Sequence, residues 1–144
     1  LVTRAEAAKM IAGAFNYSAS SSAFYSDVSS EDWFFPYISA LSEHNIVKGV
    51  GEGRFLPNDY ITREELFCIL IRVYENRFKD DLHSTPPPYK DINSVSDWAY
   101  DAVSKAAHLN IIQGDENGFI HPTNNSTRAE AAVLINRMRG VLSL

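Results

Sequence analysis

The chain repeats a segment of its own sequence, and this repetition constrains its fold more than any other feature. The pattern Thr-Arg-x-Glu begins at Thr3, Thr62 and Thr127, so its copies are separated by 59 and 65 residues. Between the copies, an aromatic-x-Asp-apolar segment, an Asp-Trp pair, an Asn-Ile-x-x-Gly segment and a Gly–Pro loop recur in the same order. Repeats of this length predict similar substructures that bury one shared core.

The repetition divides the chain into one truncated and two complete units. The complete units cover 24–78 and 89–139, and residues 1–17 match only the C-terminal helix of a unit. We expect the three to form one domain, because 144 residues is an ordinary single-domain length. The segments between them, 18–23 and 80–88, are rich in serine and alanine or end in prolines, which predicts flexible or extended linkers.

Each Thr-Arg-x-Glu copy predicts the start of a helix. In such a capping box the Thr hydroxyl accepts a hydrogen bond from the amide three residues on, and the Glu carboxylate accepts one from the Thr amide. Apolar residues then recur at helical spacing, which predicts three similar helices buried together. They are Ala7, Ala8, Ile11, Ala12 and Phe15; Leu66, Phe67, Leu70, Ile71 and Tyr74; and Ala131, Ala132, Ile135 and Met138.

The two Asp-Trp segments predict a second kind of helix. Asp32 and Asp97 are the expected N-caps, and Pro36 suits a first helical turn because its missing N–H does no harm there. These helices are expected to end near the asparagines of the Asn-Ile segments. Gly49 and Gly114, which close those segments, suit chain reversals with positive φ. The expected fold class is therefore mainly α-helical.

Composition excludes several functions. With 13 Lys and Arg against 18 Asp and Glu, the net charge of −5 argues against nucleic acid as a partner. No apolar run approaches the ~20 residues of a membrane span. The single cysteine, Cys68, cannot form an internal disulfide or a multi-cysteine zinc site and is expected in the core. The histidines lack metal-ligand spacing, and 115–118 lacks the closing Glu of a calcium loop, so we expect a turn there and no cofactor.

The ordered set of motifs resembles the S-layer homology (SLH) domain family. The resemblance covers both complete units and the N-terminal half unit. It implies a pseudo-threefold helical domain of helix-loop-helix lobes that is not an enzyme and anchors secreted proteins at the bacterial cell surface, cell wall or S-layer. The implied ligand is a secondary cell-wall polysaccharide with a pyruvylated amino sugar, or, in related modules, modified peptidoglycan. Two departures are the sequence Thr-Arg-Glu-Glu in the second copy and the missing Asp, Trp and Gly of the N-terminal unit.

The resemblance also implies binding grooves between neighbouring lobes. We expect each of the first two arginines to share a groove with the Asp, Trp and Gly of the lobe that follows it. We expect the last arginine to face the incomplete lobe. The first groove would contain Arg4, Asp27, Trp33 and Gly49, the second Arg63, Asp91, Trp98 and Gly114, and the third Arg128.

The chemistry of these residue types suits an acidic glycan. An arginine can bind a ketal carboxylate with two charge-assisted hydrogen bonds, and a tryptophan face can pack against a sugar ring. Structural alternatives stand beside each role: solvated arginines, tryptophans in the core, aspartates that cap turns and glycines that form them. A second function class is a structural or protein-interaction module, with homo-oligomers or lobes exchanged between copies. A glycosidase comes third, because no carboxylate pair is singled out.

Overall fold

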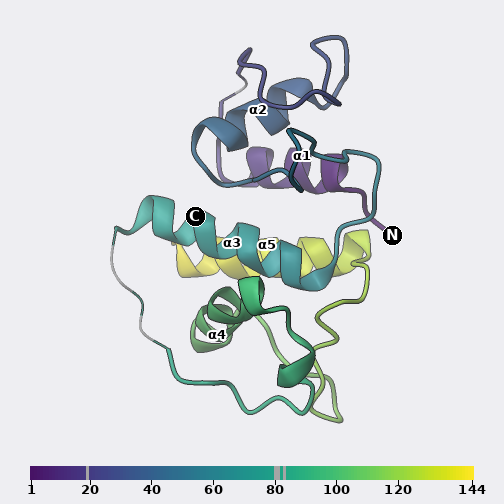
Figure 1. Cartoon of the computed structure of the whole chain (residues 1–144). Helices are drawn as coiled ribbons and strands as arrows, with labels where there is room; N and C mark the ends of the chain where they lie inside the picture. Colours follow the sequence, from purple (N-terminus) through teal and green to yellow (C-terminus); the bar gives the residue numbers. More distant parts are fainter. Residues whose placement is uncertain (19, 80–81, 83) are drawn as a thin grey trace.

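The computed structural model describes residues 1–18, 20–79, 82 and 84–144 (Figure 1). Its helices are α1 (Arg4–Ala14), α2 (Phe35–Glu43), α3 (Arg63–Arg77), α4 (Tyr100–His108) and α5 (Arg128–Val141), with 3-10 turns η1 (Ile92–Ser94) and η2 (Asp97–Ala99). Extended pairing in the described residues is limited to isolated bridges. The mainly helical class predicted from the sequence is therefore confirmed. No helix in these ranges is long and apolar enough to cross a bilayer.

The three Thr-Arg-x-Glu helices form the centre of the molecule. Helix α5 packs against both α1 and α3, while α2 covers α1 and α4 covers α3 (Figure 1). Each lobe thus joins a central helix to the Trp-led helix that follows it in sequence. In the described part of the chain, no helix covers α5 as α2 covers α1.

A closed ring of backbone hydrogen bonds links the starts of the three central helices. Ser126 O accepts from Val2 N at 3.0 Å, Ile61 O from Ser126 N at 2.9 Å, and Val2 O from Ile61 N at 3.2 Å. Each residue directly precedes a capping threonine, and all three are buried. The three helices therefore begin around one pseudo-threefold axis.

The predicted capping boxes are all present. Thr3, Thr62 and Thr127 each make both reciprocal hydrogen bonds with the glutamate three residues on. The predicted buried faces of α1 and α3 are confirmed. In α5 the prediction is wrong at Ala132, which is exposed. The reason is the uncovered face of α5, because the equivalent residues Ala8 and Phe67 lie on helices covered by α2 and α4.

The Trp-led helices begin later than predicted. Phe34 is the N-cap of α2, Ala99 is the N-cap of α4, and neither helix has a side-chain cap. Asp32 instead accepts a hydrogen bond from the Ser29 amide at 2.8 Å, and Asp97 lies inside η2. The predicted capping by these aspartates is wrong because a separate turn precedes each helix. Pro36 occupies the first turn of α2, as predicted.

The glycines after these helices are closely packed by their neighbours and do not have positive φ. The left-handed residues at the helix ends are Asn45 and Asn110, both with φ of 56°. A Cβ on Gly49 would clash with the Arg54 carbonyl oxygen and lie 2.8 Å from the Tyr25 ring, and one on Gly114 would lie 3.3 Å from Gly118 and Tyr89. The prediction of positive φ at these two glycines is therefore wrong.

The linker predictions fall partly outside the described residues, because Ala19, Asp80, Asp81 and His83 are not among them. In the described part of the first linker, the hydroxyls of Ser20 and Ser22 both donate to Glu43 at the end of α2. This part of the linker is therefore fixed to its lobe.

Ser126 is a weak point of the central ring. Its hydroxyl is fully buried and has no hydrogen-bond partner in the described structure, whereas its counterparts are Val2 and Ile61. We expect Ser126→Val to raise the free energy of unfolding by about 1 kcal/mol, because it removes an unsatisfied polar group. Urea unfolding measures this change. Ser126→Thr is the control, because it adds a methyl group and retains the hydroxyl; equal stabilisation by both variants would contradict the explanation.

Candidate functional site

The arginines of the repeated motif form a cycle with the capping glutamates. Arg4 Nη1 lies 2.6 Å from Glu65 Oε1, Arg63 Nη1 lies 3.0 Å from Glu130 Oε1, and Arg128 Nη2 lies 2.9 Å from Glu6 Oε1. In each glutamate the other oxygen, Oε2, accepts the capping hydrogen bond from the threonine amide. Each carboxylate thus caps its own helix and fixes the arginine of the central helix that precedes it in the cycle, a second role that the capping pattern did not predict.

Asp27 holds the Gly–Pro loop of the first lobe. Its carboxylate accepts from the amides of Phe55 and Leu56, each at 2.8 Å. Arg4 Nε donates to the Phe55 carbonyl of the same loop at 2.8 Å. Burial raises the pKa of Asp27, but the hydrogen bonds from Phe55 and Leu56 outweigh it and leave the pKa below its usual value. Asp27 and Arg4 therefore fix the loop from two sides.

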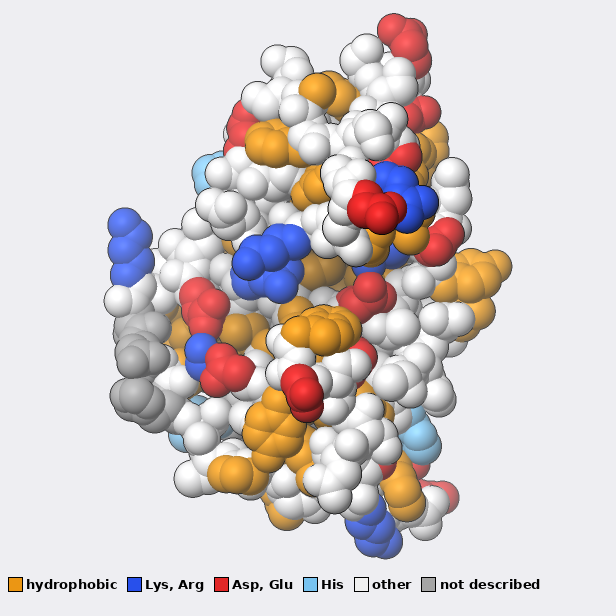
Figure 2. Space-filling model, in the orientation of Figure 1, with side chains coloured by type: hydrophobic (Ala, Val, Ile, Leu, Met, Phe, Trp, Pro, Cys, Tyr) orange, Lys and Arg blue, Asp and Glu red, His pale blue; other side chains and the backbone are white. Residues whose placement is uncertain are grey.

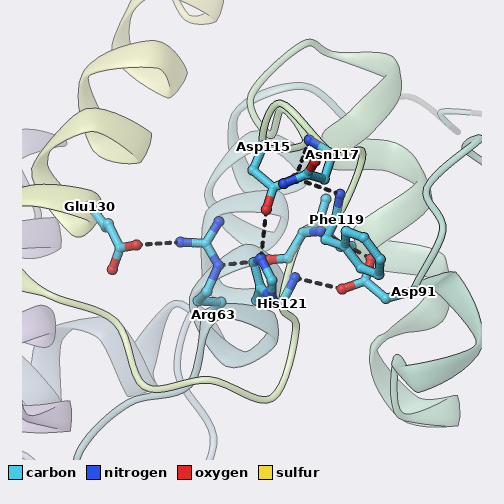
Figure 3. Close-up of polar contacts among 8 residues, drawn as sticks. Arg63, Asp91, Asp115, Asn117, Phe119, His121 and Glu130 are labelled. Atoms are coloured by element: carbon cyan, nitrogen blue, oxygen red, sulfur yellow. Dashed lines mark hydrogen bonds and ion pairs between the residues drawn. The ribbon is translucent and has the colours of Figure 1, made fainter.

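The second lobe repeats this arrangement (Figure 3). The carboxylate of Asp91 accepts from the amides of Ile120 and His121 at 3.0 and 2.7 Å, and Arg63 Nε donates to the Ile120 carbonyl at 2.7 Å. Both oxygens of each aspartate are thus engaged with backbone amides. The structure places Asp27 and Asp91 as loop supports.

Groove A is a hollow of about 430 Å³ between the first lobe's loop, α3 and the second lobe's turn. Figure 2 shows a hollow over α3 with basic side chains on both sides and hydrophobic side chains at its edge. Groove A is lined by Arg4, Lys48, Gly49, Val50, Glu65, Cys68, Ile69, Arg72 and Trp98.

The predicted assignment of the tryptophans to grooves is wrong. Trp98, not Trp33, shares groove A with Arg4 and Gly49. Trp33 lies with Arg128 in groove C, a hollow of about 520 Å³ also lined by Glu6, Lys9, Met10, Gly13 and Ala14. The Trp-bearing turn packs on the central helix that precedes it, so the tryptophan faces a groove whose arginine comes from a different lobe. Grooves A and C therefore each combine residues from different lobes.

Both tryptophans are exposed rather than buried in the core. Trp33 is 54% exposed and Trp98 is 61% exposed. The ammonium group of Lys9 lies 5.6 Å from the centre of the Trp33 ring. In the second lobe the equivalent position is Cys68, so no lysine is present there. The ring face of Trp98 is therefore not covered by a lysine at this position.

Groove B, of about 410 Å³, brings Arg63 and Gly114 together without a tryptophan. Its polar wall includes Asp115 and His121, whose Oδ2 and Nε2 atoms lie 2.9 Å apart (Figure 3). The Phe119 amide and the His121 side chain lower the pKa of Asp115 to about 2. Asp115 also accepts from the Asn117 amide, which makes 115–118 the expected turn.

Groove A carries more positive than negative charge. Arg4, Lys48 and Arg72 line it, and the single lining carboxylate, Glu65, is already bound to Arg4 and to the cap of α3. Lys48 was not predicted from the repeat because the second copy has Gln113 in its place. Arg72 was predictable, because it follows Glu65 by seven residues and so lies on the same helical face. The groove is suited to an anionic ligand that also has an apolar face.

The comparisons with known proteins agree on one family. A family model described as S-layer homology domain matches residues 24–67 and 88–132. An amylopullulanase of Thermoanaerobacterium thermosulfurigenes is 40% identical over 93% of the chain, and the surface-layer 125 kDa protein of Lysinibacillus sphaericus is 31% identical over 94%. A cellulosome-anchoring protein of Acetivibrio thermocellus is 30% identical over 94%. The chain spans 7%, 12% and 31% of the lengths of these three relatives.

Loop support by Asp27 predicts a pH-dependent contribution to stability. Because the pKa of Asp27 is lower in the folded chain than its ordinary value of 3.8, its contribution is present above that value and is lost as pH falls through the folded pKa. We expect Asp27→Asn to destabilise the protein at pH 7 and to have a smaller effect at pH 2.5. Urea unfolding at both pH values measures the difference. An equal loss at both would contradict support by the ionised carboxylate.

Cys68 is expected to be unreactive in the folded protein. It is 4% exposed, and burial raises the pKa of its thiol to about 11. Since the thiolate is the reactive form, Ellman's reagent at pH 8 should react far more slowly with the native protein than with the protein in urea. Equal rates would show that the face of α3 beside groove A opens readily.

Proposed function

Because the chain belongs to the S-layer homology domain family, we propose that it anchors a surface protein by binding an acidic cell-wall polysaccharide in groove A. SLH domains are non-catalytic modules that anchor surface proteins to the cell wall. Some relatives are named as enzymes, but this chain matches only a small part of them. Its task is therefore retention at the bacterial cell surface.

One observation carries the proposal: groove A combines an arginine, a glycine and an exposed tryptophan from three segments of the chain. Arg4 comes from α1, Gly49 from the first lobe's loop and Trp98 from the second lobe's turn. These three positions supply a charged donor, an exposed stretch of backbone and an aromatic face. Together they suit a sugar that carries a carboxylate.

The cationic groups of groove A fit a pyruvyl ketal on an amino sugar. Arg4 uses Nη1 for Glu65 and Nε for Phe55, while Nη2 makes only a long contact of 3.5 Å with the Lys48 carbonyl. Nη2 therefore retains donor capacity toward a ligand. Lys48 and Arg72 add positive charge beside it. The proposed ligand is a secondary cell-wall polysaccharide with pyruvylated amino sugars.

We expect one strong site on this chain. Groove B brings together Arg63 and Gly114 but has no tryptophan, and groove C brings together Arg128 and Trp33 but has neither matching glycine. Binding in either should be weaker than in groove A, because each lacks one of the three interactions that groove A combines.

The two exposed tryptophans make a matched pair for testing the proposal. We expect Trp98→Ala to weaken binding of purified pyruvylated wall polysaccharide about tenfold or more, which is about 1.4 kcal/mol. Trp33→Ala should change the affinity less than threefold by the same measure. Isothermal titration calorimetry measures both, and because both side chains are exposed, thermal unfolding should confirm that both variants remain folded.

Removal of the ketal from the polysaccharide separates the proposed ligand from other ligands. If the protein without substitutions loses binding when the ketal is removed, recognition of the ketal carboxylate is supported. Binding that persists without the ketal, or binding to peptidoglycan alone, would contradict the proposed ligand. Equal effects of the two tryptophan variants would contradict the assignment to groove A.

A further inference from the structure

Glu64 is a buried carboxylate that none of the repeated motifs explains. It is the second residue of α3 and is 3% exposed. The corresponding residues of the other two central helices are Ala5 and Ala129. A buried carboxylate is costly unless hydrogen bonds or charges compensate it, so its contacts identify what it holds.

The carboxylate of Glu64 binds Ser96 through both oxygens. Glu64 Oε2 accepts from the Ser96 amide at 3.0 Å, and Oε1 accepts from the Ser96 hydroxyl at 2.7 Å. Ser96 is the N-cap of η2, and its carbonyl accepts from the Ala99 amide at 2.9 Å. The turn that contains Trp98 is thus fixed to α3 at its first residue.

The position of Glu64 reduces the cost of burying it. A carboxylate in the first turn of a helix is stabilised by the helix dipole. The amide and the hydroxyl of Ser96 also supply one hydrogen bond to each oxygen of the Glu64 carboxylate. Glu64 is therefore a stable anchor point on α3, the same helix that supplies Glu65, Cys68, Ile69 and Arg72 to groove A.

The first lobe has no such link. Its residues equivalent to Glu64 and Ser96 are Ala5 and Glu31, which cannot form it. Its turn is held locally instead, by the hydrogen bond from the Ser29 amide to Asp32. The link between central helix and turn is therefore specific to the lobe whose tryptophan faces groove A.

We infer that Glu64 is a positioning residue for groove A: by fixing Ser96 to α3, it holds Trp98 at a set distance from Arg4 across the groove. The inference rests on the proposed function, because it assumes that the ligand packs against Trp98. A preorganised tryptophan loses less freedom when the ligand binds, so affinity increases without a new ligand contact.

Time-resolved fluorescence anisotropy of Trp98 tests this positioning without any ligand. In a Trp33→Phe background Trp98 is the sole tryptophan. We expect Glu64→Ala to increase the amplitude of its fast local motion about twofold, because both bonds to Ser96 are lost. Glu64→Gln retains an acceptor for the Ser96 amide and should restore the unmodified value. Unchanged anisotropy in a folded Glu64→Ala variant would overturn the inference; if that variant does not fold, Ser96→Ala, which removes only the hydroxyl bond, takes its place.

Calorimetry with pyruvylated wall polysaccharide tests the effect on binding. We expect Glu64→Ala to weaken affinity about three- to tenfold and Glu64→Gln less than twofold, as loss of preorganisation predicts. Asp32→Ala, which loosens the first lobe's turn, is the matched control and should leave the affinity unchanged. An unchanged affinity in Glu64→Ala with mobile Trp98 would overturn the inference. If the unmodified protein does not bind, the proposed function fails, and anisotropy alone decides whether Glu64 positions Trp98.

Discussion

The hydrogen-bonded ring of Val2, Ile61 and Ser126 determines the geometry of the whole domain. Each member donates one backbone bond and accepts one, so the ring closes only when three segments meet. Because a capping threonine follows each member directly, the ring also sets where each central helix begins. No single repeat can form it, so the relative placement of the three central helices depends on contacts between segments as far apart in sequence as Val2 and Ser126.

The ring brings each arginine beside the capping glutamate of another helix. Each glutamate therefore has two functions, one in its own helix and one toward the neighbouring helix. The glutamates serve the helix with one oxygen and the arginine with the other. Arg4 and Arg63 then support the loops that Asp27 and Asp91 also hold. A groove built in this way has rigid walls, and its chemistry changes with the residues that each repeat supplies. Groove A differs from grooves B and C in gathering a motif arginine, a tryptophan and the glycine that closes an Asn-Ile-x-x-Gly segment.

The sequence predicted what depends on local chemistry, and it failed where long-range geometry decides. The capping boxes follow from residues three apart, and the central helices follow from apolar spacing, so both were predictable. The arginine that shares a groove with Trp98 could not be predicted, because it depends on which central helix each Trp-bearing turn packs against. Gly49 was singled out for the wrong reason, since a Cβ is excluded there by the Arg54 carbonyl and the Tyr25 ring, two contacts that form only when the loop is folded. Glu64 was visible only as a departure from the repeat, and its link to Ser96 spans 32 residues.

The central claim is that an acidic glycan binds between Arg4 and Trp98. The most direct test is a ¹H–¹⁵N NMR titration of the two tryptophan indole N–H signals with pyruvylated wall polysaccharide. We expect the Trp98 signal to shift or broaden at ligand concentrations that leave the Trp33 signal unchanged. A response confined to Trp33, or no response of Trp98 at saturation, would contradict it.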